Sequence, residues 1–187
     1  GARVLMLSHM RGHGCDMDRL MAACRDLGVT VIEDCAHTMG AFWDGVPSGR
    51  HGAIGCYSTQ TYKHLNAGEG GLIVSDDARL MAKMILLSGS YMLYARHRAA
   101  PPPEAFEGVR MTTPNISGRM DNLRAAILRP QLRELGGADV RVLDTEAAIE
   151  TASGNAGAAR ALIRKIEDQA APGSSLWPSV LALSASF

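Results

Sequence analysis

The order of apolar segments at the start of the chain is the feature that most constrains its fold. Residues 3–8 form a short apolar run of strand length, and residues 29–32 are β-branched throughout, which predicts a fully buried parallel strand. Between them, Asp16 is placed to cap a helix that Gly28 ends. The apolar residues of that helix recur on one face (Met17, Leu20, Met21, Cys24 and Leu27). This strand–helix–strand unit predicts an α/β sheet with parallel strands joined by a right-handed crossover.

Composition and charge exclude several classes of protein. Hydrophobic residues make up 47% of the 187 residues and charged residues 20%, as in a globular protein rather than a disordered one. The 19 basic and 19 acidic residues balance, so the chain lacks the basic excess typical of a nucleic-acid-binding protein. The sequence also contains no uncharged apolar stretch long enough to span a membrane. Its four cysteines form no CxxC pair, so we expect reduced thiols and a cytoplasmic protein.

The remaining sequence continues the pattern of strands and helices as far as residue 135. The expected elements are a hairpin turn at Asp44–Gly45, strands at 53–58 and 72–74, a helix capped by Asp76 or Asp77 and running to about Leu87, an extended loop at 99–104, and a helix from Asp121 through Leu135 that is interrupted or kinked near Pro130. We therefore expect residues 1–135 to form one α/β domain.

The composition changes after Gly136, where alanine, glycine and serine dominate. Two helices are expected there, at about 145–152 and 156–170, followed by an apolar tail at 176–187. We therefore expect residues 136–187 to form a separate, partly helical C-terminal segment.

Four polar residues lie at or just after the ends of the predicted strands. Asp34 and His37 follow one strand, Ser58 ends another, and Lys63 lies in the loop after it. Open α/β sheets bind ligands at the carboxyl ends of parallel strands, so these side chains are expected to converge on one ligand. A partly buried lysine suits a Schiff-base nucleophile, and a strand-end carboxylate suits the protonated ring nitrogen of pyridoxal phosphate. A hydroxyl before a tight turn suits a phosphate.

Each of these residues also has an ordinary structural explanation when it is considered alone. A lysine in a glycine-rich loop, such as Lys63, is usually a solvated surface residue. Asp34 would more often be a helix cap or loop residue, Ser58 would simply end a strand, and His37 would be a partly buried histidine with satisfied hydrogen bonds. The choice between these explanations depends on the wider sequence pattern.

A second polar cluster has the residue types of a metal site. It consists of His9, His13, Cys15 and Asp16. Because these residues lie in a loop without helical spacing, we interpret them as a polar turn and expect no metal.

An ordered set of motifs carries a resemblance to a known family. Residues 31–41 (VIEDCAHTMGA) are followed by 52–58 (GAIGCYS), and Lys63 is followed by 68–74 (GEGGLIV). Together with flanking segments, these motifs resemble the DegT/DnrJ/EryC1/StrS aminotransferases over about residues 4–135. The resemblance implies the large domain of a fold-type-I pyridoxal-phosphate enzyme, which is a three-layer α/β/α sandwich, present here incompletely.

The resemblance also implies a role for each site residue. Lys63 would bond to the cofactor as a Schiff base and later move the substrate proton, while Asp34 would hold the pyridine nitrogen protonated. His37 would lie against the cofactor ring and its 3′-oxygen, and Ser58 would bind the phosphate. The implied reaction transfers an amino group from an amino acid, glutamate in most relatives, to a nucleotide-linked keto-sugar or keto-cyclitol. The implied assembly is a homodimer.

Some segments depart from the family pattern. The family's upstream glycine–threonine phosphate-binding turn and its ring-stacking aromatic residue are not found, and Ser117 stands where relatives commonly have asparagine. We therefore expect a partial chain with micromolar or weaker cofactor binding. The alternative to an aminotransferase is a catalytically inactive remnant of the fold that serves as a binding or dimerisation module.

Overall fold

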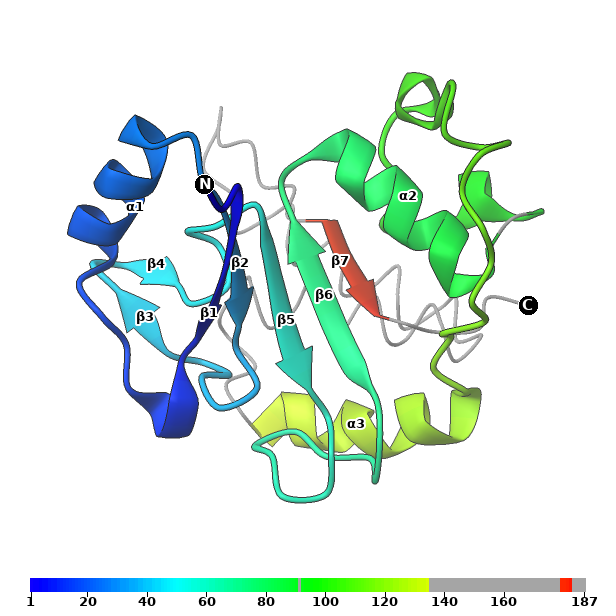
Figure 1. The fold of residues 1–187 in the computed structure, drawn as a ribbon. Coiled ribbons are helices and arrows are strands. Elements are labelled where there is room, and N and C mark those ends of the chain that lie inside the picture. The colour runs from blue at the N-terminus through cyan, green and yellow to red at the C-terminus, as the bar shows by residue number, and fades with distance from the viewer. Residues whose placement is uncertain (91, 135–178, 183–187) are drawn as a thin grey trace, which may run out of the picture.

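One mixed sheet organises the part of the chain that the computed structural model describes, which comprises residues 1–90, 92–134 and 179–182 (Figure 1). Its strands, in spatial order, are β1 (Val4–Ser8), β2 (Thr30–Asp34), β5 (Ile54–Ser58), β6 (Gly71–Ser75) and β7 (Ser179–Ala182). β1, β2 and β5 are parallel, whereas β6 runs antiparallel to both β5 and β7. The parallel pairing of β1 with β2 confirms the predicted strand–helix–strand unit.

The α-helices of the described residues begin at the aspartates predicted to cap them. They are α1 (Met17–Asp26), α2 (Ala78–Ser88) and α3 (Asn122–Glu134). A carboxylate oxygen of Asp16, Asp77 or Asp121 accepts a backbone N–H from the first turn of each helix, at 2.8–3.0 Å. These bonds satisfy N–H groups that have no partner within the helix.

Short elements connect these helices and strands. They are η1 (Met10–Gly12), β3 (Phe42–Trp43), β4 (Val46–Pro47), η2 (Tyr94–Arg96) and η3 (Pro103–Phe106). β3 and β4 pair antiparallel across Asp44 (φ 45°) and Gly45 (φ 75°). Two consecutive positive φ angles are those of a type I′ turn, so the predicted hairpin is confirmed.

Helices cover both faces of the sheet, as two neighbouring residues of β6 show. Leu72 packs in a buried cluster with Ala125, Leu128 and Leu132 of α3. The next residue, Ile73, packs against the cluster that α2 forms with Phe106 and Val109. Successive strand residues point to opposite faces, so α3 and α2 lie on opposite sides of the sheet. The expected α/β fold with three layers is confirmed.

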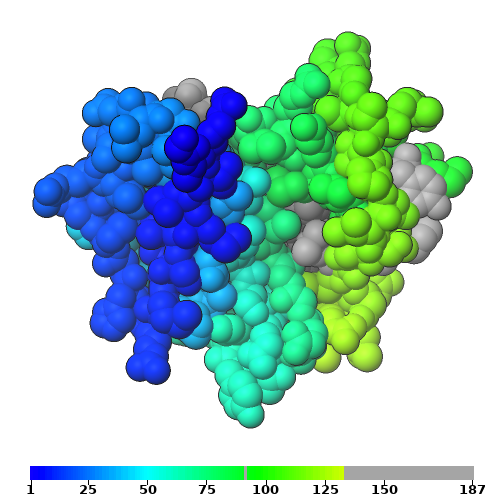
Figure 2. All heavy atoms as spheres, viewed as in Figure 1, coloured from blue at the N-terminus to red at the C-terminus, as the bar shows by residue number. Residues whose placement is uncertain are grey.

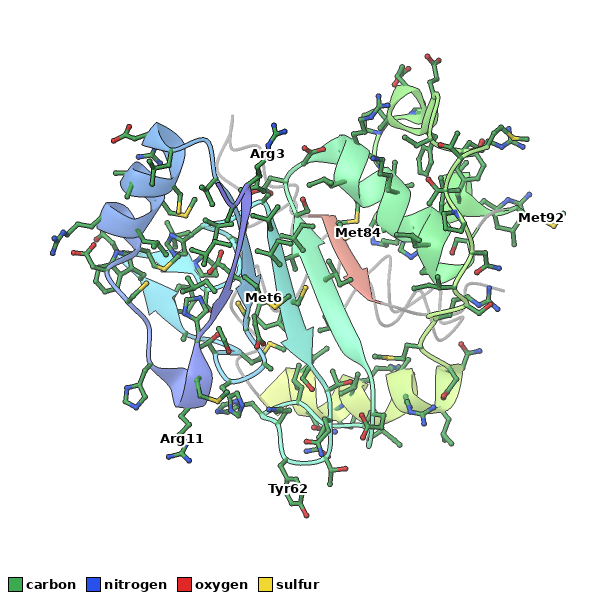
Figure 3. The ribbon with its side chains drawn as sticks, in the orientation of Figure 1. Arg3, Met6, Arg11, Tyr62, Met84 and Met92 are labelled. Carbon is green, nitrogen blue, oxygen red and sulfur yellow. The ribbon has the colours of Figure 1, made fainter. Side chains whose placement is uncertain are left out.

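The expectation that the second strand is fully buried is wrong. Val31 and Glu33 are buried, but Thr30 is exposed and Ile32 is half-buried. α2 covers only the β5–β6 side of that face, and Met6 of β1, which pairs with Ile32, is 70% exposed (Figure 3). In the space-filling view the N-terminal segment, in dark blue, lies on the surface that faces the viewer (Figure 2).

Three smaller expectations also need correction. The loop at 99–104 is not extended throughout, because Pro103 begins the short helix η3, where the fixed φ of proline suits a first helical position. α3 continues through Pro130 without interruption, whereas the alternative expectation of a kink there stays a prediction. Leu27 follows the last residue of α1 and is 78% exposed, so the buried stripe of that helix ends before it.

The expected helices at 145–152 and 156–170 lie outside the described residues, and the predicted boundary at 135/136 stays a prediction. β7, from the expected tail, pairs with β6 and so extends the sheet. Among the described residues, no helix is long and apolar enough to cross a membrane.

Candidate active site

Three polar side chains share one face of the sheet at the carboxyl ends of its parallel strands. Ser8 ends β1 and pairs with Asp34 at the end of β2, and Asp34 pairs in turn with Cys56 of β5. Ser58, two residues beyond Cys56, points to the same face because strand side chains alternate. The hydroxyl of Ser8 donates to Oδ2 of Asp34 at 2.9 Å, and the backbone N–H of Ala36 donates to Oδ1 at 3.1 Å. The Asp34 carboxylate is therefore held from both oxygens.

Lys63 and His37 meet at this same edge. The loop 59–70 leaves β5 where that strand ends, and its Tyr62 projects from the end of the molecule where Arg11, which follows β1, also lies (Figure 3). Nζ of Lys63 lies 3.1 Å from Nε2 of His37. Both side chains are half-buried, so a ligand can reach them while bulk water is partly excluded.

The Lys63 loop is tied to α3, which lies behind it in the view of Figure 1. Nε2 of Gln131 donates to the carbonyl oxygen of Asn66 at 2.7 Å, and its Oε1 accepts the Asn66 N–H at 2.8 Å. Leu65 is completely buried in the cluster that contains the apolar face of α3. Two residues close to Lys63 are thus fixed, and this limits the positions that the amine can reach.

The two ends of the loop 59–70 lie close together, and the glycines at its second end make this close approach possible. The backbone N–H of Thr59 donates to the carbonyl oxygen of Gly70 at 3.0 Å. Gly70 has φ 136°, and a Cβ there would lie 2.7 Å from Oγ1 of Thr59. The Ser58 hydroxyl accepts the N–H of Gln60 at 3.2 Å, which keeps it in the turn. Ser58 therefore shares the edge and face of Asp34, while its own hydrogen bond stays local.

The thiol of Cys56 lies between these groups and remains protonated. Burial, and then the negative charge of Asp34, raise the pKa of Cys56. A neutral thiol adds no second negative charge beside Asp34. The carboxylate is therefore the anionic group that this part of the site offers to a protonated ring nitrogen.

The four residues considered above as a metal site, His9, His13, Cys15 and Asp16, do not form a cluster of potential metal ligands in the structure. Among the described residues, the group that gathers three potential metal ligands is His9, Glu33 and Cys35, which shares only His9 with those four residues. Burial raises the pKa of Cys35 to about 12, so its thiol is neutral and a poor ligand. A cavity of about 180 Å³ lies beside His9 and Thr38, but neither Lys63 nor Asp34 lines it.

The donor set at the carboxyl edge fits pyridoxal phosphate. A primary amine matches the cofactor's aldehyde, a carboxylate matches its pyridine nitrogen, and a hydroxyl in a turn matches its phosphate. The geometry adds two residues that the sequence analysis did not single out, namely Ser8 and Gln131. Ser8 was noted only as the end of a strand, and Gln131 acts across 65 positions, so no local pattern signals it.

Comparison with known proteins identifies the family of the chain. The family model of the DegT/DnrJ/EryC1/StrS aminotransferases matches residues 2–155. The chain is 35% identical over 140 residues to the L-glutamine:scyllo-inosose aminotransferase of Streptomyces griseus. The aligned segment covers 74% of this chain and 32% of that protein. This chain is also 34% identical over 133 residues to the GDP-perosamine synthase of Caulobacter vibrioides. That alignment covers 71% of this chain and 33% of the synthase.

A solved structure shows the same fold. The crystal structure of DesI in the presence of its TDP-sugar product superposes with a TM-score of 0.57 and 26% identity, covering 78% of this chain and 34% of that chain. The chain spans about a third of the length of these relatives. Pyridoxal phosphate is the cofactor of the family, and the chain belongs to the DegT/DnrJ/EryC1/StrS aminotransferase family.

Proposed function

We propose that this chain carries the cofactor-binding part of an aminotransferase that uses pyridoxal phosphate. The proposed reaction moves an amino group from an amino acid to a nucleotide-linked keto-sugar or keto-cyclitol. The observation that carries the proposal is the 3.1 Å contact between Lys63 and His37 at the sheet edge that also presents Asp34 and Ser58. Family membership supports this assignment of the four residues.

Each residue would have a distinct task. When bound, pyridoxal phosphate supplies an electron sink that stabilises negative charge at the substrate carbon. Lys63 would offer the amine that matches the cofactor aldehyde, and its Nζ would hold and move the substrate proton. His37 hydrogen-bonds Nζ and orients it. Asp34, fixed by Ser8, keeps the pyridine nitrogen protonated, and Ser58 binds the phosphate.

The names of the relatives support the substrate class. One is an aminotransferase that acts on scyllo-inosose, and another is a synthase of the GDP-linked sugar perosamine. The Streptomyces griseus protein is named for glutamine as amino donor, whereas the sequence resemblance implied glutamate. We propose that the donor is one of these two amino acids.

A homodimer is the proposed assembly, and an exposed apolar face of α3 supports it. Leu123 is 74% exposed and Ile127 is 43% exposed. They are four positions apart and so lie on the same side of the helix. A second copy of the chain packed on this face would remove both side chains from water. It would then contact α3, the same helix that supports the Lys63 loop.

Covalent capture of the cofactor tests the site. We expect the purified chain, mixed with pyridoxal phosphate, to develop a visible absorption band, and borohydride to fix the cofactor on Lys63, as mass spectrometry of the peptides shows. Lys63→Ala should abolish the band and the adduct. Lys83→Ala is the matched control, because Lys83 is exposed on α2 and lies outside the site. A colourless wild-type chain without an adduct would favour an inactive remnant of the fold.

A second measurement tests the reaction. Glutamate and glutamine are added separately to the cofactor-loaded protein, and the keto acid formed in a single turnover is quantified. One of them should yield about one equivalent of keto acid per loaded site, and a nucleotide-linked keto-sugar added afterwards should accept the amino group and become the amino-sugar. A protein that is loaded at Lys63 but transfers no amino group would refute the aminotransferase proposal and leave the cofactor site intact.

A further inference from the structure

Glu33 is completely buried one position before Asp34, and its carboxylate accepts four hydrogen bonds. Oε2 accepts from Nε2 of His9 at 3.1 Å and from the N–H of Gly49 at 2.9 Å. Oε1 accepts the backbone N–H groups of His51 at 2.8 Å and Gly52 at 2.7 Å. A carboxylate has about four acceptor positions, so Glu33 has none left for a metal ion or a ligand.

These bonds join three strands. Segment 49–52 leads directly into β5, and the N–H of Ala53 continues the ladder to the carbonyl oxygen of Val31 in β2 at 2.8 Å. The approach is close, because a Cβ on Gly52 would lie 2.6 Å from that same carbonyl oxygen. His9 follows the last residue of β1. Glu33 therefore fixes the entrance of β5 and the exit of β1 against the end of β2.

Glu33 and Asp34 point to opposite faces of the sheet. Each accepts a hydrogen bond from a side chain at the point where β1 ends. Ser8 donates to Asp34 on the face of the candidate active site, and His9 donates to Glu33 on the other face. In the register of β1 and β2, Ser8 is the partner of Asp34 and Leu7 is the partner of Glu33, so His9 reaches Glu33 diagonally from just beyond the end of β1. A shift of Glu33 along or around the strand must therefore displace the neighbouring Asp34 carboxylate.

We propose that Glu33 is a positioning residue for cofactor recognition, an inference that rests on the proposed function. Its buried carboxylate sets β2 against β1 and β5, and thereby aims the Asp34 carboxylate at the pyridine nitrogen. A residue with only a packing role would affect stability and the affinity for every cofactor analogue alike. A residue that aims Asp34 affects the contact at the ring nitrogen specifically.

The test compares the affinity of pyridoxal phosphate with that of 1-deazapyridoxal phosphate, in which a C–H group replaces the ring nitrogen. The wild-type chain should prefer the natural cofactor by about tenfold or more, because a charge-assisted hydrogen bond is lost with the analogue. Asp34→Ala should abolish this preference. Glu33→Gln should reduce it to within about threefold, because an amide oxygen can accept only two of the four bonds.

Two further variants keep the test decisive. His9→Phe retains the three backbone bonds to Glu33 and tests the proposal even where Glu33→Gln does not fold; it should reduce the preference partially. Arg50→Gln is the control, because Arg50 lies in the same segment but pairs with the exposed Asp76. An unchanged preference in folded Glu33→Gln or His9→Phe would overturn the positioning role. A wild-type chain that forms no adduct at Lys63 would overturn the proposed function, and this inference with it.

Discussion

Nζ of Lys63 lies 3.1 Å from Nε2 of His37, although the two residues are 26 positions apart and lie on different loops. The segment of His37 continues β2, and the loop of Lys63 continues β5. β2 and β5 are adjacent and parallel, so the two loops leave the sheet at the same edge. The contact therefore follows from the strand order, and it places an imidazole against the proposed nucleophile.

The hydrogen-bonding capacity of His37 is expected to assist covalent capture of pyridoxal phosphate by Lys63. His37→Leu should slow the capture about tenfold or more, because Nζ loses a polar partner that orients it. His37→Gln should remain within about threefold of the wild-type rate, since the amide can still hydrogen-bond Nζ. The rate is measured by borohydride trapping and mass spectrometry. His64→Gln is the control, because His64 is exposed; equal rates for the His37→Leu variant and this control would contradict the role.

Removing the bridge between Gln131 and Asn66 is expected to loosen the loop 59–70. Gln131→Leu deletes both bonds to the Asn66 backbone and should lower the free energy of unfolding by about 1–3 kcal/mol. Hydrogen exchange at residues 64–67 should accelerate, and denaturant unfolding gives the free energy. Gln131→Glu keeps an acceptor for the Asn66 N–H, so it should lie between the wild-type chain and Gln131→Leu. Unchanged exchange in Gln131→Leu would show that the burial of Leu65 and the backbone bonds within the loop fix it without Gln131.

Ser117 has φ 53°, a left-handed conformation that asparagine tolerates better than most residues. Ser117→Asn is therefore expected to raise the free energy of unfolding by up to about 1 kcal/mol. Ser117→Val should lower it, because a β-branched side chain is strained at positive φ. Denaturant unfolding of the three proteins should give the order Asn, Ser, Val. The reverse order would mean that this backbone conformation is not the native one.

His97 is expected to make the protein less stable as the pH falls. Burial lowers the pKa of His97 from 6.5 to about 4, and its Nδ1 accepts the N–H of Ala99 at 3.1 Å. Between pH 6.5 and 4 the unfolded chain binds a proton at this residue and the folded chain does not, so stability is lost across that window. The loss from pH 7 to pH 5 should be about 2 kcal/mol. In His97→Gln this component is absent, and denaturant unfolding at both pH values measures the difference.

Local sequence patterns predicted most elements of the described fold. Capping by Asp16 was correctly predicted, and so was capping by one of the pair Asp76 and Asp77, because a short acidic side chain before a helical apolar pattern satisfies N–H groups of the same segment; the structure selects Asp77. The turn at Asp44–Gly45 was correct for a similar reason, since its backbone conformation depends on the residues of the turn itself. The burial of β2 was predicted wrongly, because burial depends on which helix covers each part of the sheet.

The sequence by itself determined where most of the strands and helices of the described residues form, that acidic and hydroxyl residues end the parallel strands, and which family the chain resembles. These properties depend on neighbouring residues or on an ordered set of motifs, and both can be read along the chain. Only the tertiary structure decided that Lys63 contacts His37, that Gln131 holds the loop and that Glu33 joins three strands. Such contacts depend on strand order and register, which bring distant residues within hydrogen-bonding distance without leaving a local pattern in the sequence.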